Sequence, residues 1–562
     1  MRAGRVAVLA AVGLCQFSCG LADKLISTGG QVTLKAAPAT QSAGPHVIIF
    51  ALDGAGHDQF MAAVYSGKAP NIAGILGRNL GGGLFAQGYS APNALSMLPS
   101  STIADWSAVF TGDPPAWDGV AGDEWFERDN QTFRAPVPLS TRETGDVASD
   151  VGDDLLGKTL KVPTLYQLIN TDSNVSLQTV YHGATRYTVV GPGSFPGLLG
   201  DLISGKLNGE SAEKSVAATL DTDSVPKLIE AIKQHGVPGL QVVYFPGIDA
   251  FTHGSPDPLQ AQTGYIETVT DPLVGQVLDA YRQADALNGT YIIFIADHGH
   301  TPTTNDGAHE LGADGNDTPF ALVRDAGYRV RKPVLKLAAN QQDYQAVLAY
   351  QGFMAYIYLA DRSTCPKPGD RCQWNKPPRY QQDVLPLVRA FAHENLTGRP
   401  IPRLKGTLDL IFTRIPAAPG QNAAPYEIWD HGRLVPIGEY LKRHPRPDLF
   451  ELERRMDWLS AGPYGNRAGD ILLLARATGA ITDRYAFGAE HFYSWHGSPD
   501  WTDSNVTFVL AQEGGSGTRM RDIVQRESDD QPYEKDITPI VRSLFKPSIK
   551  DEKPTLEAGL QH

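Results

Sequence analysis

This sequence of 562 residues has few cysteines, no long apolar run beyond its N-terminus and no excess of basic charge. With only 4 cysteines, the chain lacks the second mature cysteine pair that a zinc ribbon needs. Beyond the N-terminus, no segment reaches the roughly 18 uninterrupted apolar residues of a transmembrane helix, so we expect no membrane span. The formal net charge of −13 argues against a general binder of nucleic-acid duplexes or anionic membranes.

The N-terminal residues have the pattern of an export signal. Arg2 and Arg5 precede the apolar run Val6–Leu14, which is too short for a bilayer that needs about 20 residues. We therefore predict an export signal at residues 1–19 and, because the following residues are small and polar, a linker at 20–44. The mature protein is expected to be periplasmic or extracellular.

The cysteines fall into two pairs with different expected fates. Cys19 is a candidate for lipid modification, as in bacterial lipoproteins, although Gln16 replaces the leucine usual at such a cleavage site. In the alternative, Cys15 and Cys19 are both removed with the leader. Cys365 and Cys372 enclose a short loop rich in Pro and Gly, and in an oxidising compartment we expect them to form a disulfide, with two free thiols as the alternative.

Short apolar runs alternate with helix-like stretches along the chain. In Leu259–Leu287, for example, apolar residues recur near the 3.6-residue period of an amphipathic helix. This alternation favours an α/β fold with a mostly parallel central sheet flanked by helices. The runs typical of buried parallel strands are His46–Leu52, Gln241–Phe245, Tyr291–Ala296, Asp470–Leu474 and Asn505–Leu510.

The chain is long enough for one domain with a large insertion. The segment 306–468 is richer in Pro and Arg and interrupts the alternation of strands and helices, so we interpret it as an inserted cap. The catalytic α/β core would then consist of 45–305 and 469–545. The polar segment 546–562 is predicted to be a mobile tail.

Carboxylates and imidazoles lie in the loops that follow or connect the predicted strands. In an open α/β sheet, ligands bind beyond the carboxyl ends of the strands, so these loops would deliver the side chains to one edge. The candidate residues are Asp53, Asp249, His253, Asp297, His298 and His496.

Aspartate and histidine are typical ligands of zinc, which takes three or four per ion. Asp249 and His253 would face the same way on one helical turn and form a first site with His496. A second site would consist of Asp53, Asp297 and His298. Two ions about 3.5–4 Å apart could hold the attacking and leaving oxygens of a phosphoryl transfer. Taken singly, each residue also has an ordinary interpretation as a helix cap or a surface group, so the prediction depends on their joint occurrence.

A nucleophile is expected in the segment Ser100–Ser101–Thr102, directly before the predicted helix Ile103–Phe110. A hydroxyl at that place feels the positive field of a helix N-terminus. Ordinary N-capping is the favoured interpretation of the two serines, whereas Thr102 could be an alkoxide bound to a metal ion.

Five stretches of the sequence together carry a family resemblance. They are VIIFALDG at 47–54, PSSTIADWSAVFTGDPPAWDGVAGD at 99–123, FPGIDAFTHG at 245–254, ADHGH at 296–300 and WHGSPDWTDSNVTFVLA at 495–511. With these stretches in this order, the chain resembles the alkaline phosphatase superfamily and, within it, the type I phosphodiesterases and nucleotide pyrophosphatases. The resemblance implies an alkaline-phosphatase-like α/β fold and hydrolysis of a phosphate ester.

The resemblance also implies two bound zinc ions and selects the nucleophile. By its distance from the pair Thr111–Gly112, Thr102 matches the family's nucleophile, so a phosphothreonine intermediate is expected on Thr102. The implied ligands are Asp249, His253 and His496 for one ion, and Asp53, Asp297, His298 and Thr102 for the other.

The sequence departs from the family pattern at several positions. Asp105 stands where many relatives have an Asn that donates to a phosphoryl oxygen, and an ionised Asp can only accept. We include Asp105 among the candidate substrate contacts, in which case it would be protonated or turned away, or another donor would serve. Asp118 replaces a family histidine. His57 and His300 are expected to contact the ligands or the substrate, with exposed loop histidines as the alternative.

The expected function is that of an exported hydrolase acting on a small phosphate ester. No Lys or Arg is adjacent to Thr102, which favours diesters, because a monoester carries an additional negative charge. A phosphomonoesterase of the same fold is the first alternative, and a binding protein that retains the fold without catalysis is the second. No oligomeric state is predicted.

Overall fold

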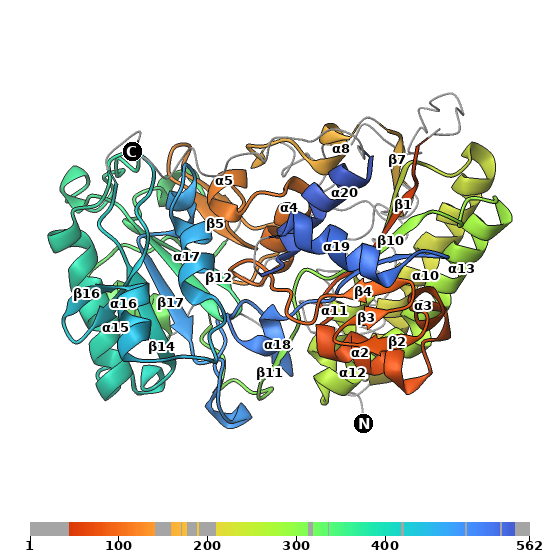
Figure 1. Ribbon diagram of the computed structural model, residues 1–562. Helices are drawn as coiled ribbons and strands as arrows, with labels where there is room; N and C mark the ends of the chain where they lie inside the picture. Colours follow the sequence, from red (N-terminus) through yellow and green to blue (C-terminus); the bar gives the residue numbers. More distant parts are fainter. Residues whose placement is uncertain are drawn as a thin grey trace, which may run out of the picture.

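In the computed structural model, the protein has two lobes that lie side by side, each built around one large β-sheet (Figure 1). The predicted export signal with its cysteines, the linker up to residue 43 and the tail 546–562 lie outside the described residues. Among the described residues, no helix is long and apolar enough to cross a bilayer. The structure describes residues 44–140, 159–169, 171–176, 188–189, 210–312, 318–334, 336–417, 421–488, 492–528 and 531–545.

The first lobe contains a nine-stranded sheet whose strands, in spatial order, are β2 (Asn79–Gly81), β3 (Leu84–Phe85), β4 (Gly88–Ser90), β19 (Phe508–Gln512), β10 (Tyr291–Ile295), β1 (Val47–Leu52), β9 (Leu240–Phe245), β7 (Ser173–Val175) and β8 (Thr188–Val189). From β10 to β8, all neighbouring strands are parallel. On the other side, β19 and the three short strands pair antiparallel. The predicted α/β fold with a mostly parallel central sheet is confirmed.

The predicted direction of one strand was wrong. The run Asn505–Leu510 is of the parallel type in sequence, yet β19 pairs antiparallel with β10, with Phe508 opposite Ile295. A short apolar run carries no information about strand direction, because direction depends on how the chain enters the sheet.

Strand β1 forms the centre of the sheet, and its residues are buried on both faces. Phe50 stacks on Phe294 of β10 with ring centroids 5.0 Å apart and faces Phe245 of β9 at 6.3 Å. A continuous apolar run is what a central parallel strand needs, since helices cover both of its faces. This buried strand carries Asp53 at its carboxyl end.

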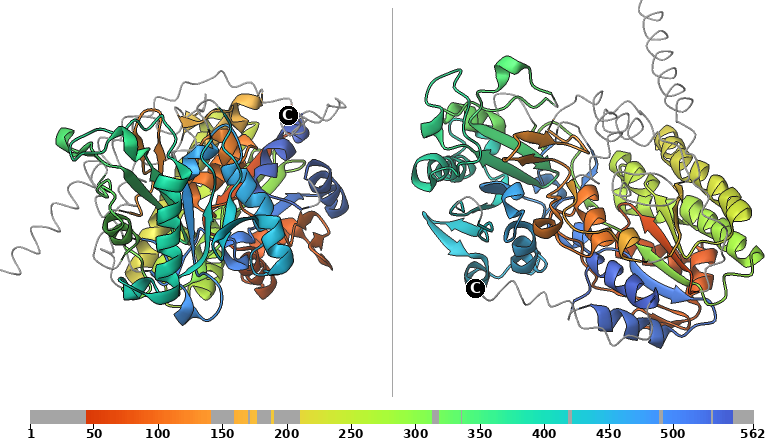
Figure 2. Two further views of the ribbon diagram at one scale, coloured as in Figure 1. Left: turned by 90° about the vertical axis from the view of Figure 1, so that its left-hand side faces the viewer. Right: turned by 90° about the horizontal axis from the view of Figure 1, so that it is seen from above.

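Helices lie on both faces of this sheet, with α10 (Glu210–His235) and α13 (Asp271–Gln283) on one face and α19 (Gly517–Glu527) and α20 (Ile537–Phe545) on the other (Figure 2). The predicted helix Leu259–Leu287 consists of α12 (Pro258–Tyr265), a π-helical turn at Ile266–Thr270, and α13. The remaining main helices of this lobe are α2 (His57–Ser66), α3 (Pro70–Leu76), α4 (Thr102–Thr111), α5 (Pro115–Asp118) and α11 (Gly247–Gly254).

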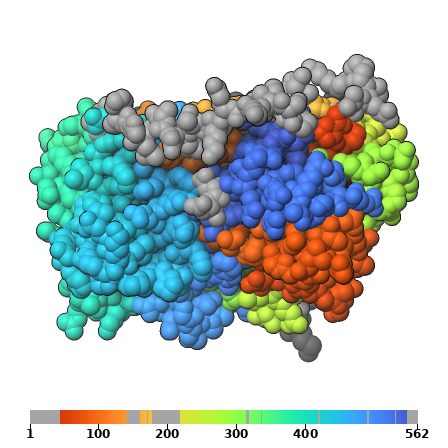
Figure 3. Space-filling model, viewed as in Figure 1, coloured from red at the N-terminus to blue at the C-terminus, as the bar shows by residue number. Residues whose placement is uncertain are grey.

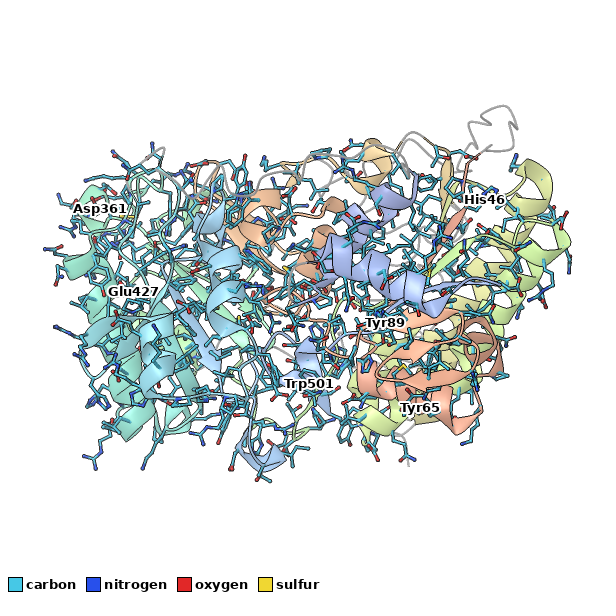
Figure 4. All side chains as sticks on the ribbon, viewed as in Figure 1. His46, Tyr65, Tyr89, Asp361, Glu427 and Trp501 are labelled. Atoms are coloured by element: carbon cyan, nitrogen blue, oxygen red, sulfur yellow. A yellow bond between two sulfur atoms is a disulfide. The ribbon has the colours of Figure 1, made fainter. Side chains whose placement is uncertain are left out.

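The second lobe contains a six-stranded antiparallel sheet whose strands, in spatial order, are β12 (Ala346–Gln351), β13 (Met354–Leu359), β17 (Ile471–Ala475), β14 (Leu408–Thr413), β15 (Glu427–Asp430) and β16 (Arg433–Pro436). Its principal helices are α14 (Pro319–Asp325), α15 (Leu385–Thr397), α16 (Ile437–Arg443) and α17 (Leu452–Ser460). Cys365 and Cys372 are joined by a disulfide in the same loop as Asp361, with Cα atoms 4.8 Å apart (Figure 4).

Strand β17 corrects the prediction for the run Asp470–Leu474, which we assigned to the central sheet. The strand lies inside the second sheet, between β13 and β14. Five buried apolar residues look the same in either sheet, so the sequence could not assign the strand. The domain boundaries stay a prediction, and this pairing supports placing the end of the insertion after Ala475 instead of at 468.

The turn between β12 and β13 reaches from the second lobe into loops of the first, and Figure 3 shows the two lobes packed closely together. At Gly352, where φ is +65°, an added Cβ atom would lie 2.0 Å from the carbonyl oxygen of His496. Gln351 Oε1 accepts a hydrogen bond from Asp123 N at 2.7 Å, and Phe353 N donates to His496 O at 3.2 Å. The second lobe therefore supports a loop that carries a predicted ligand.

Replacement of Phe50 by alanine would remove the ring at the centre of the sheet. We expect Phe50→Ala to lower the free energy of unfolding by about 3–5 kcal/mol, because it leaves a cavity between three strands. Denaturant unfolding followed by tryptophan fluorescence measures the change. Leu396→Ala, at a side chain that is 76% exposed, is the control and should change stability by less than about 0.5 kcal/mol. Equal effects of the two substitutions would contradict the prediction.

Candidate active site

Segments that follow the parallel strands bring the predicted site residues together. Asp53 lies directly after β1, α11 follows β9 and carries two of the residues, and the pair Asp297–His298 follows β10. The loop after the short strand β18 (Ser494–Trp495) adds His496. The residues that meet here are Asp53, Thr102, Asp249, His253, Asp297, His298 and His496, and all are buried.

Three overlapping groups of carboxylate and imidazole atoms make up the site, and within each group the atoms lie within 4.8 Å of one another. Because two of the residues, Asp249 and His298, occur in more than one group, the groups form one continuous cluster. The rings of His298 and His496 also stack with centroids 3.7 Å apart. The groups are Asp249–His253–His496, Asp249–His298–His300 and Asp53–Asp297–His298.

The spacing of these atoms fits tetrahedral metal coordination. With zinc bonds of about 2.0–2.2 Å, neighbouring ligand atoms lie about 3.3–3.6 Å apart. Asp249 Oδ1 lies 3.3 Å from His253 Nε2 and 3.8 Å from His496 Nε2. In the other predicted set, His298 Nε2 lies 3.5 Å from an oxygen of each carboxylate. Both predicted ligand sets therefore have separations close to those of zinc ligands.

Two of the carboxylates are each held by one oxygen and leave the other free. Asp297 Oδ1 accepts hydrogen bonds from Gly54 N at 3.0 Å and from His298 N at 2.9 Å, and its Oδ2 has no hydrogen-bond partner. Asp53 Oδ2 accepts from the hydroxyl of Tyr244, and its Oδ1 has no partner. Buried carboxylate oxygens without a donor are costly, and a bound cation removes that cost.

The ring nitrogens are arranged in the same way in all three predicted histidine ligands. Each Nδ1 lies within hydrogen-bond distance of a backbone carbonyl oxygen, which can only accept, so Nδ1 carries the hydrogen and Nε2 offers its lone pair. The acceptors are Ser494 O for His253 at 2.7 Å, Gly299 O for His298 at 2.9 Å and Ser100 O for His496 at 3.0 Å.

The electrostatics of the cluster also favour cations. Burial, followed by the charge of Asp249, raises the pKa of Asp53 well above its usual value, and burial followed by the charge of Asp53 does the same for Asp297. Burial lowers the pKa of His298 to about 3 and that of His496 well below its usual value. His298 and His496 are therefore neutral, and Asp53 and Asp297 need positive charge from elsewhere to be ionised at neutral pH. His253 and Asp249 shift the other way: burial opposes both shifts, but the attraction between the two groups raises the pKa of His253 and lowers that of Asp249.

Thr102 lies beside this cluster at the first residue of α4. Its Oγ1 lies 3.1 Å from His298 Nε2. Ser101 occupies the N-cap position, yet its side chain makes no capping hydrogen bond, so ordinary N-capping by this serine is not observed. Instead, Asp123 Oδ1 accepts from Ile103 N at 3.1 Å. The start of the helix is thus fixed by a carboxylate from a distant loop.

A buried arginine of the second lobe holds the loop before Thr102. Arg455 on α17 donates through Nη2 to Met97 O at 2.8 Å and to Ser100 Oγ at 3.0 Å. Ser100 Oγ in turn lies 3.0 Å from Ser498 O, to which it can donate. The second lobe and the loop of His496 therefore both contribute to the position of Thr102.

A sequence model of the type I phosphodiesterase/nucleotide pyrophosphatase family matches residues 47–367. The chain belongs to this family. It is thereby a phosphoric ester hydrolase of the alkaline phosphatase superfamily. No curated protein matches the chain significantly. The residues that match the family model include every predicted metal ligand except His496. The structure places His496 beside the other predicted ligands of this phosphodiesterase family member.

Asp105 lies on α4, one helical turn after Thr102, and is fully buried. Its Oδ1 lies 3.2 Å from Met97 N, which also donates to Glu534 Oε1 at 2.8 Å. Burial, followed by the charge of Glu534, raises the pKa of Asp105 well above its usual value. A protonated Asp105 would carry no charge to repel a phosphate, and its contact with substrate stays a prediction.

The two other histidines that we predicted as neighbours of the site are both buried, so neither is an exposed loop residue. His57 Nε2 lies 3.3 Å from Ser90 Oγ, and His57 belongs to none of the groups of ligand atoms found among the described residues. His300 does belong to one, with Nε2 3.0 Å from Asp249 Oδ1. Substrate contacts of both residues stay predictions.

Asp221 on α10 supports the site but was not predicted from the sequence, because a lone acidic residue within a helix resembles a surface residue. Asp221 Oδ1 accepts from Gly247 N at 3.2 Å, and its Oδ2 accepts from the hydroxyl of Tyr265 at 2.9 Å. Gly247 is the first residue of α11, which carries Asp249 and His253. Burial raises the pKa of Asp221 to about 8.

The raised pKa of Asp221 predicts a pH-dependent loss of stability. The folded protein keeps the carboxyl protonated up to about pH 8, whereas the unfolded chain releases the proton near pH 4, so wild-type stability falls between these values by up to about 1.4 kcal/mol per pH unit. Asp221→Asn cannot titrate, and its stability relative to wild type should rise from about pH 5 to pH 8. Denaturant unfolding at several pH values measures this. A parallel pH profile for both proteins would contradict the prediction, and the exposed Asp285→Asn serves as the control.

Proposed function

We propose that this member of the phosphodiesterase family is exported and hydrolyses a small phosphodiester with two divalent metal ions, preferentially zinc, and a covalent intermediate on Thr102. The observation that carries the proposal is the meeting of six aspartate and histidine side chains beside the Thr102 hydroxyl. The export signal lies outside the described residues, and the disulfide between Cys365 and Cys372 supports an oxidising compartment.

Two sets of side chains would hold the ions. When bound, the ions neutralise the buried carboxylates and act as Lewis acids toward the phosphate and the threonine hydroxyl. Imidazoles that carry their hydrogen on Nδ1 and carboxylate oxygens that accept no hydrogen bond suit zinc as ligands. The sets are Asp249, His253 and His496 for one ion, and Asp53, Asp297, His298 and Thr102 for the other.

Thr102 is the nucleophile in the proposed reaction. Its Oγ1 attacks phosphorus, the bond from phosphorus to the leaving ester oxygen breaks, the hydroxyl loses its proton and the leaving alcohol takes one from solvent. Water then attacks the phosphothreonine, and cleavage of the bond between phosphorus and Oγ1 restores the hydroxyl. The N-terminus of α4 places the positive end of the helix dipole beside the negative charge that develops.

A diester fits the described cationic groups around Thr102 better than a monoester. Arg455 is the arginine that reaches the loop before Thr102, and both of its terminal nitrogens donate to protein atoms. Its side chain is fully buried, so it does not offer its charge to a substrate. The additional charge of a phosphomonoester would therefore receive little compensation from this side chain.

Replacement of the nucleophile tests the covalent step. We expect Thr102→Ala to reduce hydrolysis of bis-p-nitrophenyl phosphate by at least about 10³-fold, because no attacking oxygen remains on the protein. Thr102→Ser keeps the hydroxyl and should retain measurable turnover, with a serine phosphoester trapped by acid quench. Hydrolysis by Thr102→Ala at the parental rate would show that the nucleophile is another group.

The relative rates on two esters test the substrate class. We expect kcat/KM of the zinc-loaded protein to be higher for bis-p-nitrophenyl phosphate than for p-nitrophenyl phosphate, because the site offers little positive charge for a dianion. The reverse order would support the phosphomonoesterase. Metal binding with no turnover of either ester would support the alternative of a binding protein.

A further inference from the structure

A pocket in the second lobe is lined by three arginines and lies apart from the metal-binding cluster. Its volume is about 320 Å³, which is typical of pockets for small ligands. Of the described residues that line it, none is acidic and none belongs to the candidate active site. The charged and polar residues that line this arginine pocket are Arg329, Arg362, Arg379, Gln345, Ser363 and Gln382.

Loops at the outer end of the second lobe form the arginine pocket. Arg329 follows α14, Arg362 follows β13 and Arg379 precedes α15. Asp361, the neighbour of Arg362 in sequence, lies toward the outer end of this lobe in Figure 4, well apart from Trp501 of the first lobe. The pocket is therefore separate from the place where the two lobes meet.

Two of the arginines are fixed by one buried carboxylate. Arg379 donates through Nε and Nη2 to the two oxygens of Asp383, at 2.9 Å each. Arg362 donates through Nε to Asp383 Oδ1 at 3.1 Å and through Nη2 to Gln382 O at 2.7 Å. Its guanidinium carbon also lies 4.2 Å from the centre of the Tyr328 ring. These contacts fix the orientation of both guanidinium groups.

The third arginine, Arg329, is held by backbone carbonyl groups. Its Nε donates to Asp343 O at 2.7 Å and its Nη2 to Cys365 O at 2.9 Å. The disulfide between Cys365 and Cys372 closes the loop that begins at this second carbonyl. In all three arginines, Nε and Nη2 are thus fixed, whereas Nη1 makes no hydrogen bond to a described residue. The N–H groups of each Nη1 remain for a ligand.

The pocket has an excess of positive charge. The ion pairs around it join the three arginines and Lys376 to three carboxylates, so one positive charge is left over. The side chains of Asp361 and Asp383 are completely buried, whereas 24–42% of each arginine side chain is exposed. A ligand that enters the pocket therefore meets guanidinium groups and not the carboxylates behind them.

We propose that the arginine pocket binds a phosphate group, either as inorganic phosphate or as part of a phosphomonoester. Guanidinium groups suit phosphate because their planar N–H donors form parallel, charge-assisted hydrogen bonds to its oxygens. Three such groups from separate loops can contact a tetrahedral anion from different sides, whereas a carboxylate offers only two oxygens. The volume is about ten times the roughly 30 Å³ of a water molecule, which leaves room for an organic substituent on the phosphate.

Gln382→Glu tests the pocket without removing any of its arginines. Gln382 is exposed, and the substitution adds one negative charge with almost no change of shape. In isothermal titration calorimetry of the zinc-loaded protein at constant ionic strength, we expect this site to bind inorganic phosphate at least about 10-fold more weakly than in wild type, because like charges repel. The matched control is Gln525→Glu, at an exposed residue of α19, which should bind phosphate as wild type does.

Hydrogen exchange followed by mass spectrometry locates the bound phosphate in the wild-type protein. We expect phosphate to slow exchange in the peptides that contain Arg362 and Arg379. Slowing only around Thr102 would place the phosphate at the metal-binding cluster and overturn the proposal. This measurement needs no substitution, so it decides the proposal even if Gln382→Glu fails to fold.

Phenylphosphonate, whose carbon–phosphorus bond resists ester hydrolysis, distinguishes the two sources of the phosphate group. Tighter binding of phenylphosphonate than of phosphate indicates a phosphomonoester, and the reverse order indicates inorganic phosphate. Identical isotherms of wild type and Gln382→Glu with both ligands would overturn the proposal and show that the arginines only neutralise buried carboxylates. Because the pocket uses no metal ion, loss of the proposed dinuclear function would leave these outcomes unchanged.

Discussion

The structure depends on a concentration of negative charge in a place that water hardly reaches. Asp53, Asp249 and Asp297 converge from three strand ends, and the pKa values of Asp53 and Asp297 are raised by burial and by neighbouring carboxylates. Such a cluster is stable only with protons or cations in it. The neutral imidazoles of His298 and His496 offer lone pairs, so the arrangement favours cations. The parallel sheet, the helix of Thr102 and the supporting loops all serve to hold these side chains within a few ångströms of one another.

The second lobe is part of this arrangement. Its hairpin turn at Gly352 lies against the backbone of His496, Gln351 binds the loop of Asp123, and Arg455 holds the segment before Thr102. Trp501 of the first lobe, labelled in Figure 4, packs on Phe450 with ring centroids 4.6 Å apart. The chain segments that precede and follow β17 are therefore in contact. The nucleophile and one metal ligand therefore take their positions from residues distant in sequence.

Much of the fold and site could be predicted because the signals are local. Apolar runs identified β1, β9 and β10, and the acidic residues after them proved to lie together. The direction of β19 and the sheet that contains β17 depend on long-range pairing, which a run of apolar residues does not encode. The cap of α4 by Asp123 and the support of α11 by Asp221 were missed for the same reason, because a single carboxylate has no pattern. For Asp105, only the three-dimensional structure revealed Glu534 as a neighbour.

The contact between Gly352 and His496 has a consequence for how relatives of this enzyme could diverge. A hairpin turn that leaves no room for a single methyl group must keep its length and its glycine whatever happens elsewhere in its sheet. The outer strands and helices of that sheet are free of this restriction. Changes that alter substrate choice should therefore accumulate toward the periphery of the second lobe, and a lobe exchanged between two homologues would work only if the turn and the histidine loop were transferred together.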